Sequence, residues 1–217
     1  WCALFYVFTN SRSQMTDTKT QILDATEHLI AEKAFAGTTL RNIASAAGVN
    51  LAAVHYHFGS KEDLFRAVVQ RIAKPVVARQ LDMLNQLKQK TVVPSVEDLL
   101  TAFLTPPLEF ISGGASPGIV QAQFMGRCRT EPEPIQSVAR QEFSASMDSF
   151  LDVLQRALPD QSRSQLDWKL DLVIAVLIQV QMQAGKPNAL LQSNRPKDIQ
   201  NTISTLVDFM TPAMRAS

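Results

Sequence analysis

The chain has few of the features that mark disulfide-rich or metal-binding proteins. It contains only two cysteines in 217 residues, Cys2 and Cys128, and neither belongs to a Cys-x-x-Cys pair. This usage argues against a disulfide framework and against a zinc ribbon. Because free cysteines are typical of reducing compartments, we expect a cytoplasmic protein.

An excess of one charge and long apolar runs are also missing. The 21 basic residues nearly balance the 20 acidic ones, which leaves a formal net charge of +1. A basic coat over the whole surface is therefore not supported, and any basic surface must be local. The apolar run "WCALFYVF" has eight residues, whereas a transmembrane helix needs roughly 20. We expect no membrane partner.

The first residues differ in character from the rest of the chain. No basic residue precedes Arg12, although a secretory signal begins with a basic region. We interpret residues 1–14 as a non-native or disordered extension, either translated upstream sequence or an expression remnant, with the native start at Met15. The alternative is a peripheral apolar arm.

From Thr18 onward the sequence has helical periodicity. The first stripe recurs every three or four positions at Ile22, Ala25, Thr26, Leu29 and Ile30, which is typical of an amphipathic helix. Similar patterns predict about nine helices, and we find no convincing second strand. Because an isolated strand cannot bury a face, the predicted fold class is all-α.

Three short helices open the predicted fold. Glycine residues end them at Gly37, Gly48 and Gly59. Thr38 and Thr39 are candidate N-caps for the second helix and Asn50 for the third. The third helix has only about eight residues. Such a pair of helices, joined by a four-residue turn containing a glycine, is typical of a helix-turn-helix.

Longer helices follow. Ser60 and Asp63 form a variant capping box for a helix from Lys61 to about residue 87, which Pro75 is expected to kink or divide. Further helices are predicted over residues 96–111, 119–129, 130–158, 164–184 and 197–210.

The two histidines in "VHYHF" raise the question of a metal site. Residues two apart on a helix point about 200° apart, so His55 and His57 cannot share an ion if they are helical. We predict no metal and no cofactor. The sequence also lacks a phosphate-binding glycine loop, a nucleophile elbow and other catalytic motifs.

Residues 19–65, and above all "TTLRNIASAAGVNLAAVHYHFGSKEDLF", resemble the DNA-binding unit of the TetR family of transcriptional regulators. The matching positions are Thr39, Ile43, Ala44, Gly48, Val49, Tyr56, His57, Phe58, Ser60, Lys61 and Leu64. The resemblance implies a helix-turn-helix DNA-binding domain over residues 15–65. It implies a helical bundle for ligand binding and dimerisation over residues 66–217.

The resemblance and side-chain chemistry together predict the DNA-binding residues. The first half of a recognition helix meets base edges and flanking groups hold phosphates. Base contacts are predicted for Asn50, Leu51, Ala52 and Ala53, and a base or backbone contact for Arg41. Phosphate contacts are predicted for Thr39, His55, Tyr56, His57 and Lys61. Thr39 as a cap alone, Arg41 as a solvated residue, and Tyr56 and His57 as packing residues remain alternatives.

The resemblance further implies a small-molecule effector, of hydrophobic character, in the C-terminal half. Candidate lining residues are Phe103, Phe110, Phe124, Met125, Arg127 and Trp168, although aromatic residues at helical spacing also occur as ordinary core. The last two long helices carry more apolar surface than one bundle face needs, and in the family they form the homodimer interface.

We therefore predict a cytoplasmic, ligand-responsive transcription regulator, in most members of this family a repressor. It would act as a homodimer on a near-palindromic double-stranded DNA operator and be released by its effector. Two alternatives stay open: an all-α enzyme that uses the C-terminal cavity without a recognisable catalytic motif, and a membrane-associated interaction protein that depends on residues 1–8.

Overall fold

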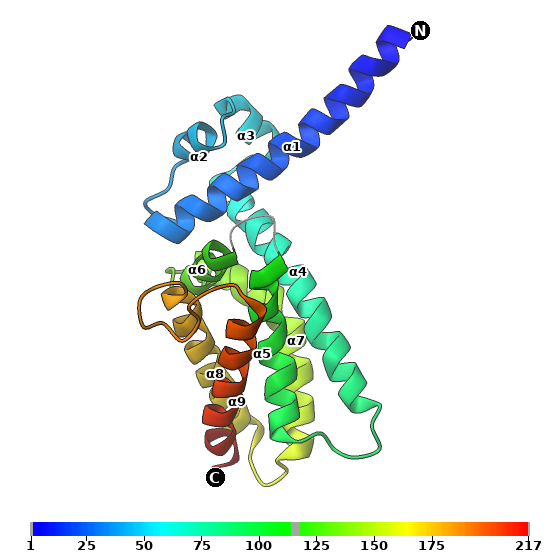
Figure 1. Ribbon diagram of the computed structural model, residues 1–217, viewed down its shortest axis with the longest axis vertical. Coiled ribbons are helices and arrows are strands. Elements are labelled where there is room, and N and C mark those ends of the chain that lie inside the picture. Colours follow the sequence, from blue (N-terminus) through cyan, green and yellow to red (C-terminus); the bar gives the residue numbers. More distant parts are fainter. Residues whose placement is uncertain (1, 114–117, 217) are drawn as a thin grey trace. The chain divides into compact units, whose positions relative to one another are not determined.

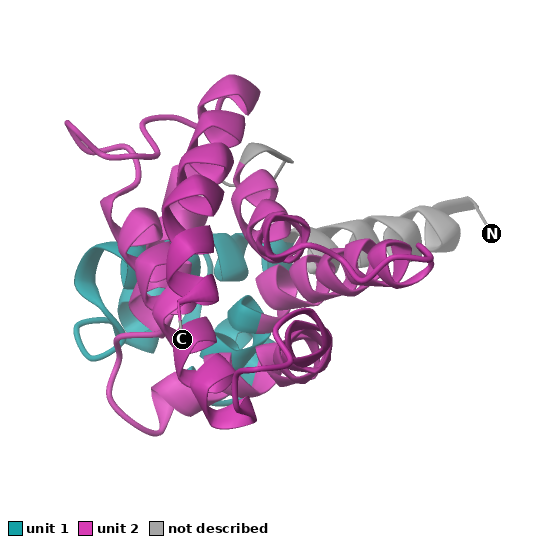
Figure 2. Cartoon of the chain, turned by 90° about the horizontal axis from the view of Figure 1, so that it is seen from below, with its two compact units in different colours: residues 1–69 teal, residues 70–217 magenta. Residues whose placement is uncertain are grey.

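The computed structural model describes residues 2–113 and 118–216, with side chains described from Thr18 and outside residues 112–117. Within these residues the protein contains nine helices and no strand (Figure 1). The all-α prediction is confirmed. The chain divides into two compact units, Trp1–Val69 and Gln70–Ser217 (Figure 2).

The first unit holds α1 (Cys2–Lys33), α2 (Leu40–Ala46), α3 (Leu51–Phe58) and the start of α4 (Lys61–Lys88). Its core contains Ile22, Ile30, Ile43, Val54, Leu64 and Phe65, each at most 1% exposed. The interpretation of residues 1–14 as an extension falls on side chains outside the described residues, so it stays a prediction.

Three side-chain caps define the starts of α2, α3 and α4. Thr39 accepts a hydrogen bond from the backbone N–H of Asn42 at 3.1 Å, and Asn50 accepts one from Ala53 at 2.7 Å. Ser60 does the same for Asp63 at 3.0 Å. Each cap satisfies a donor that a helix start leaves free. Of the two candidates predicted before α2, Thr39 is the cap, whereas the Thr38 hydroxyl donates to the carbonyl of Ala34 at 2.9 Å.

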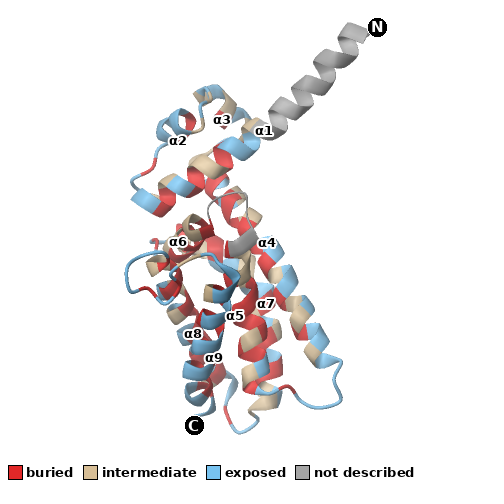
Figure 3. Cartoon of the chain, viewed as in Figure 1, coloured by how far each residue is buried: buried red, intermediate tan, exposed pale blue. Residues whose placement is uncertain are grey.

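The second unit consists of the rest of α4 and five further helices: α5 (Val96–Gly113), α6 (Gly118–Cys128), α7 (Ile135–Ala157), α8 (Arg163–Gln183) and α9 (Pro196–Arg215). The most extensive helix pairs are α5 with α9 and α6 with α8. Buried residues follow the inward faces of these helices (Figure 3), so one apolar core runs through the unit.

Several helices differ from the sequence prediction, and α7 begins at Ile135 where residue 130 was expected. Pro75 does not divide α4, which continues unbroken to Lys88. The last helix continues to Arg215 instead of ending near Met210. Its final carbonyls receive donors from elsewhere: the Gln161 side chain donates to the carbonyl of Met214 at 2.9 Å, and the buried Lys169 ammonium donates there at 3.3 Å. These bonds stabilise the last turn.

None of the helices in the described part of the chain is both long and apolar enough to cross a membrane.

Candidate functional site

The third helix, α3, has one buried and one exposed side. Val54 and Phe58, four residues apart, are 1% and 9% exposed and attach α3 to the first unit. Ala52, His55 and Tyr56 are exposed on the same short helix. Tyr56 is 78% exposed. A large aromatic side chain that is this open to water indicates an interaction site.

The remaining residues predicted to contact DNA lie around the same helix-turn-helix. Arg41 on α2 is exposed, as is Asn50 at the start of α3. Asn50 uses its Oδ1 as the cap of α3, so its NH₂ group faces solvent. The predicted residues Leu51 and Ala53 are half-buried.

Thr39 and His55 also make local contacts that keep the motif in shape. The Thr39 hydroxyl donates to Oδ1 of Asn42 at 2.6 Å in addition to accepting its cap bond. Nδ1 of His55 lies 3.0 Å from the carbonyl oxygen of Gly59, which it bonds in the Nδ1–H tautomer. That geometry leaves Nε2 of His55 for another partner.

Tyr56, His57 and Lys61 gather at the end of α3. The rings of Tyr56 and His57 meet edge to face with centroids 5.2 Å apart. The Lys61 ammonium lies 4.0 Å from the centroid of the Phe35 ring, a cation–π contact that orients it. A phenol and an imidazole therefore lie side by side at the end of α3, an ammonium belongs to the first residue of α4, and all three groups can donate to phosphate oxygens.

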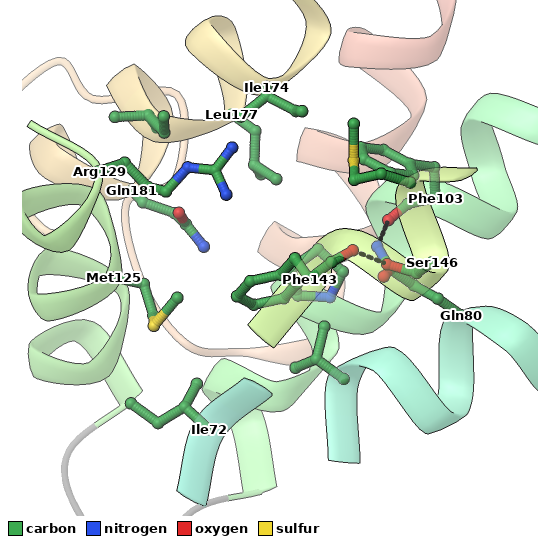
Figure 4. Close-up of a pocket in the computed structure, with 14 residues that line it drawn as sticks. Ile72, Gln80, Phe103, Met125, Arg129, Phe143, Ser146, Ile174, Leu177 and Gln181 are labelled. Atoms are coloured by element: carbon green, nitrogen blue, oxygen red, sulfur yellow. Dashed lines mark hydrogen bonds between the residues drawn. The ribbon is translucent and has the colours of Figure 1, made fainter. Parts of the chain in front are cut away.

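The second unit encloses a cavity lined by residues of α4, α5, α6, α7 and α8 and by the residue after α6 (Figure 4). Most of its wall is apolar and includes Ile72, Val76, Phe103, Met125, Phe143 and Leu177. The polar lining residues are Gln80, Arg129, Ser146 and Gln181. Apolar walls with a few polar groups are typical of small-molecule sites.

The sequence predicted part of this lining. Phe103 and Met125 line the cavity, whereas Phe110 and Arg127 are half-buried outside its lining. Phe124 is fully buried in the core. Trp168 does not line this cavity either and is 51% exposed on α8.

Sequence reasoning missed the polar groups of the cavity, above all Arg129. Arg127 and Arg129 are two positions apart and cannot face the same way on one helix. The structure ends α6 at Cys128 and brings Arg129 to the cavity. For Arg129 the sequence held no signal. For a polar residue such as Gln80 the sequence held one, Pro107 inside α5, because a helical proline leaves the carbonyl four residues earlier in need of another donor.

A second apolar feature lies on α8 and α9. Trp168, Leu172 and Phe209 are 51%, 56% and 71% exposed, and with Val173 and Val176 they surround one surface hollow. Exposed apolar residues grouped in this way mark an interaction surface. We call the set Trp168, Leu172, Val176 and Phe209 the α8–α9 surface.

Comparisons with known proteins agree with this arrangement. Residues 22–68 match the bacterial regulatory proteins of the tetR family, and residues 101–213 match the tetracyclin repressor-like C-terminal domain. The transcriptional regulator TtgR of Pseudomonas putida is 32% identical over 62 residues, which are 29% of this chain and 30% of TtgR. The repressor AcnR of Corynebacterium glutamicum is 31% identical over 71 residues, 33% of this chain and 36% of AcnR.

The alignments with these two proteins thus span about a third of their length. Among solved structures, FadR from Bacillus subtilis in complex with stearoyl-CoA has the same fold. Its TM-score is 0.59, and 16% of its sequence is identical over 88% of this chain and 97% of FadR. These relatives are transcriptional regulators and not enzymes. Since the two family profiles cover the helix-turn-helix and most of the second unit, the chain belongs to the TetR family of transcriptional regulators.

Proposed function

We propose that this protein is a ligand-responsive, sequence-specific DNA-binding regulator that acts as a cytoplasmic homodimer. The observation that carries the DNA-binding part is the exposed side of α3, where Ala52, His55 and the 78% exposed Tyr56 stand opposite the buried Val54 and Phe58. A helix attached in this way presents its outer face to a major groove.

Within this proposal the side chains divide by task. Asn50, Leu51, Ala52 and Ala53 read base edges, since small side chains allow close approach and the Ala methyl can contact a thymine methyl. Arg41 contacts a base or the backbone. Thr39, His55, Tyr56, His57 and Lys61 hold phosphates, and Lys61 also begins α4, whose free N–H groups attract an anion.

The α8–α9 surface supports the homodimer. A two-fold dimer covers the same surface on both chains, which would remove Trp168, Leu172 and Phe209 from water. Two copies then present two recognition helices to a near-palindromic operator.

The cavity of the second unit supports an effector. FadR of Bacillus subtilis, which has the same fold, holds stearoyl-CoA. A ligand shifts the operator affinity only by its differential affinity for two dimer geometries. We propose that the effector favours the geometry whose recognition helices no longer match the half-sites, so that the protein is a repressor released by its ligand.

A band-shift assay with genomic fragments tests DNA binding. We expect retardation at low salt that weakens steeply as salt rises, because phosphate contacts release counterions. Tyr56→Ala and Lys61→Ala should each weaken binding, and Lys61→Ala should lower the slope of log affinity against log salt by about two, one for each chain of the dimer.

The matched control is Lys88→Ala, which removes the same charge from an exposed position in the second unit. Thermal unfolding of each variant separates a lost phosphate contact from a loss of the Lys61–Phe35 contact. If no genomic fragment is retarded at low salt, or if Lys88→Ala weakens binding as much as Lys61→Ala, the proposed interface is wrong.

A further inference from the structure

The cavity of the second unit contains one charged residue, Arg129. Within the part of the chain that the structure describes, no hydrogen bond or ion pair to its guanidinium is formed. The remaining wall is mainly apolar and includes Phe103, Phe143 and Leu177. A guanidinium carries five N–H donors and forms paired bonds with planar anions, so this side chain is ready for an anionic partner.

Charge and burial make this position costly for an arginine. Burial lowers the pKa of Arg129, and the nearby positive charge of Arg140 lowers it further, while Asp171 acts in the opposite direction. Arg129 is half-buried, and a charge partly removed from water without a hydrogen-bonded partner does not stabilise a fold. Stability therefore does not explain Arg129, whereas a ligand that brings its own negative charge does.

Gln80 supplies a second polar group, whose side-chain oxygen lacks a hydrogen-bond partner among the described residues. Pro107 has no backbone N–H, which leaves the carbonyl of Phe103 in α5 without its helical partner. Nε2 of Gln80 donates to that carbonyl at 2.8 Å. This bond determines the orientation of the amide, because the flipped amide would place oxygen against oxygen.

The oxygen of the same amide is then left over. Oε1 of Gln80 is buried and has no hydrogen-bond partner, and Gln80 is 2% exposed and lines the cavity. An acceptor in this state costs stability until a donor reaches it. In Figure 4 Arg129 and Gln181 lie on one side of the cavity and Gln80 and Ser146 on the other. The cation that needs an anion and the amide oxygen that needs a donor are therefore on different sides of a mainly apolar cavity.

These features restrict the chemistry of the occupant. One cation matches one negative charge, which favours a carboxylate over a phosphate dianion. The cavity has about 60 Å³ of space, less than the roughly 300 to 1,000 Å³ of typical ligand sites. The apolar body must therefore be compact, and its entry must displace flexible lining residues such as Met125 and Met147.

We propose that the effector is a compact, apolar monocarboxylate that carries a hydroxyl or N–H donor at the end away from the carboxylate. Its carboxylate pairs with Arg129, and its donor bonds Oε1 of Gln80. This inference rests on the proposed function, in which this cavity is the effector site, and it names the chemical class of the effector.

Calorimetric titration of the purified full chain without DNA tests the class. The probes are 3-phenylpropanoate, 3-(4-hydroxyphenyl)propanoate, octanoate and 8-hydroxyoctanoate, each beside its methyl ester. We expect the acids to bind about tenfold or more tightly than their esters, because a hydrogen bond to a charged group contributes more than a neutral one. In each series the hydroxylated acid should bind about threefold or more tightly than its parent.

Two variants assign the carboxylate contact. Arg129→Met keeps an unbranched stem but removes the charge, and it should erase the preference for acids over esters. Arg156→Met removes the same charge from an exposed position outside the cavity and should leave the preference intact. Thermal unfolding without ligand should show Arg129→Met at least as stable as the parent protein, since it removes a half-buried charge whose guanidinium forms no hydrogen bond or ion pair within the described residues.

Gln80→Met tests the donor contact, and the paired probes on the parent protein keep that test valid if this variant fails to fold. The inference is overturned if no acid binds at about 1 mM, if esters or octanoyl-CoA bind as tightly as the acids, or if Arg129→Met retains the preference. A hydroxyl that changes nothing overturns the Gln80 contact. A chain that retards DNA but binds no acid contradicts this class alone, whereas one that binds acids but retards no DNA contradicts the proposed function.

Discussion

Single side chains decide where α2, α3 and α4 begin and how the chain turns between them. Thr39, Asn50 and Ser60 could be assigned as caps from the sequence, since each bonds a backbone N–H only three residues later. The role of Gly48 as the end of the second helix could also be predicted, because it follows a short apolar face. The structure gives Gly48 a φ of +66°, a left-handed conformation that costs little only for glycine.

Replacing Gly48 tests this backbone requirement. An added Cβ would meet no atom within 4 Å, so any cost must come from the left-handed φ and not from a clash. We expect Gly48→Ala to destabilise the first unit by about 1 to 2 kcal/mol, measured by urea unfolding of the full chain. Gly48→Asn should cost less, because asparagine tolerates this region. Equal costs for the two variants would show that φ is not the cause.

The cavity arginine shows where reasoning from single residues stops. The sequence has an arginine at 127 and another at 129, and the prediction named Arg127 alone. The choice depends on where α6 ends and on which side α7 and α8 approach it. Gln80 has the same difficulty, because its partner Phe103 lies 23 positions later in the chain.

The helices differ in whether neighbouring or distant residues stabilise their ends. The start of α8 is local: Ser162 accepts from the N–H of Gln165 at 3.2 Å, and the Gln165 side chain accepts from the N–H of Ser162 at 2.7 Å. The end of α9 is not local, because Gln161 and Lys169 supply donors to its last carbonyls. A pattern confined to residues 197–210 could not predict that support.

Removing the capping box of α8 has a calculable effect. Ser162→Ala should destabilise the second unit by about 1 kcal/mol, measured by the urea midpoint at an unchanged slope. Gln165→Ala should cost less, and the double variant should cost less than the sum because the two bonds are reciprocal. Ser204→Ala, at an exposed position inside α9, should stay within about 0.5 kcal/mol. A Ser204→Ala effect as large as that of Ser162→Ala would contradict a specific capping role.

For the assembled protein, we predict a homodimer from the exposed apolar residues of the α8–α9 surface. The chain has a mass of 24.0 kDa, and we expect light scattering after gel filtration to give twice that mass. Leu172→Glu or Phe209→Glu would bury a charge without a partner in the interface, and each should shift the protein to the mass of one chain. Operator affinity should fall in parallel, since a single recognition helix reads only one half-site.

Val92→Glu is the matched control for the dimer. Val92 is 77% exposed and lies outside the α8–α9 surface, so the same substitution there should leave the mass unchanged. A single-chain mass for the parent protein at micromolar concentration would contradict the dimer, and so would dissociation by Val92→Glu.

The amino-acid sequence was sufficient for the all-α class, the helix-turn-helix, its caps and its resemblance to the TetR family, because those features depend on residues within a few positions of one another. The cavity was decided only when α4, α5, α6, α7 and α8 packed together. Its polar groups come from distant parts of the chain. Whether Gln80 meets the carbonyl freed by Pro107, and whether Arg127 or Arg129 reaches the interior, depends on helix ends and helix approach, which no short stretch of sequence contains.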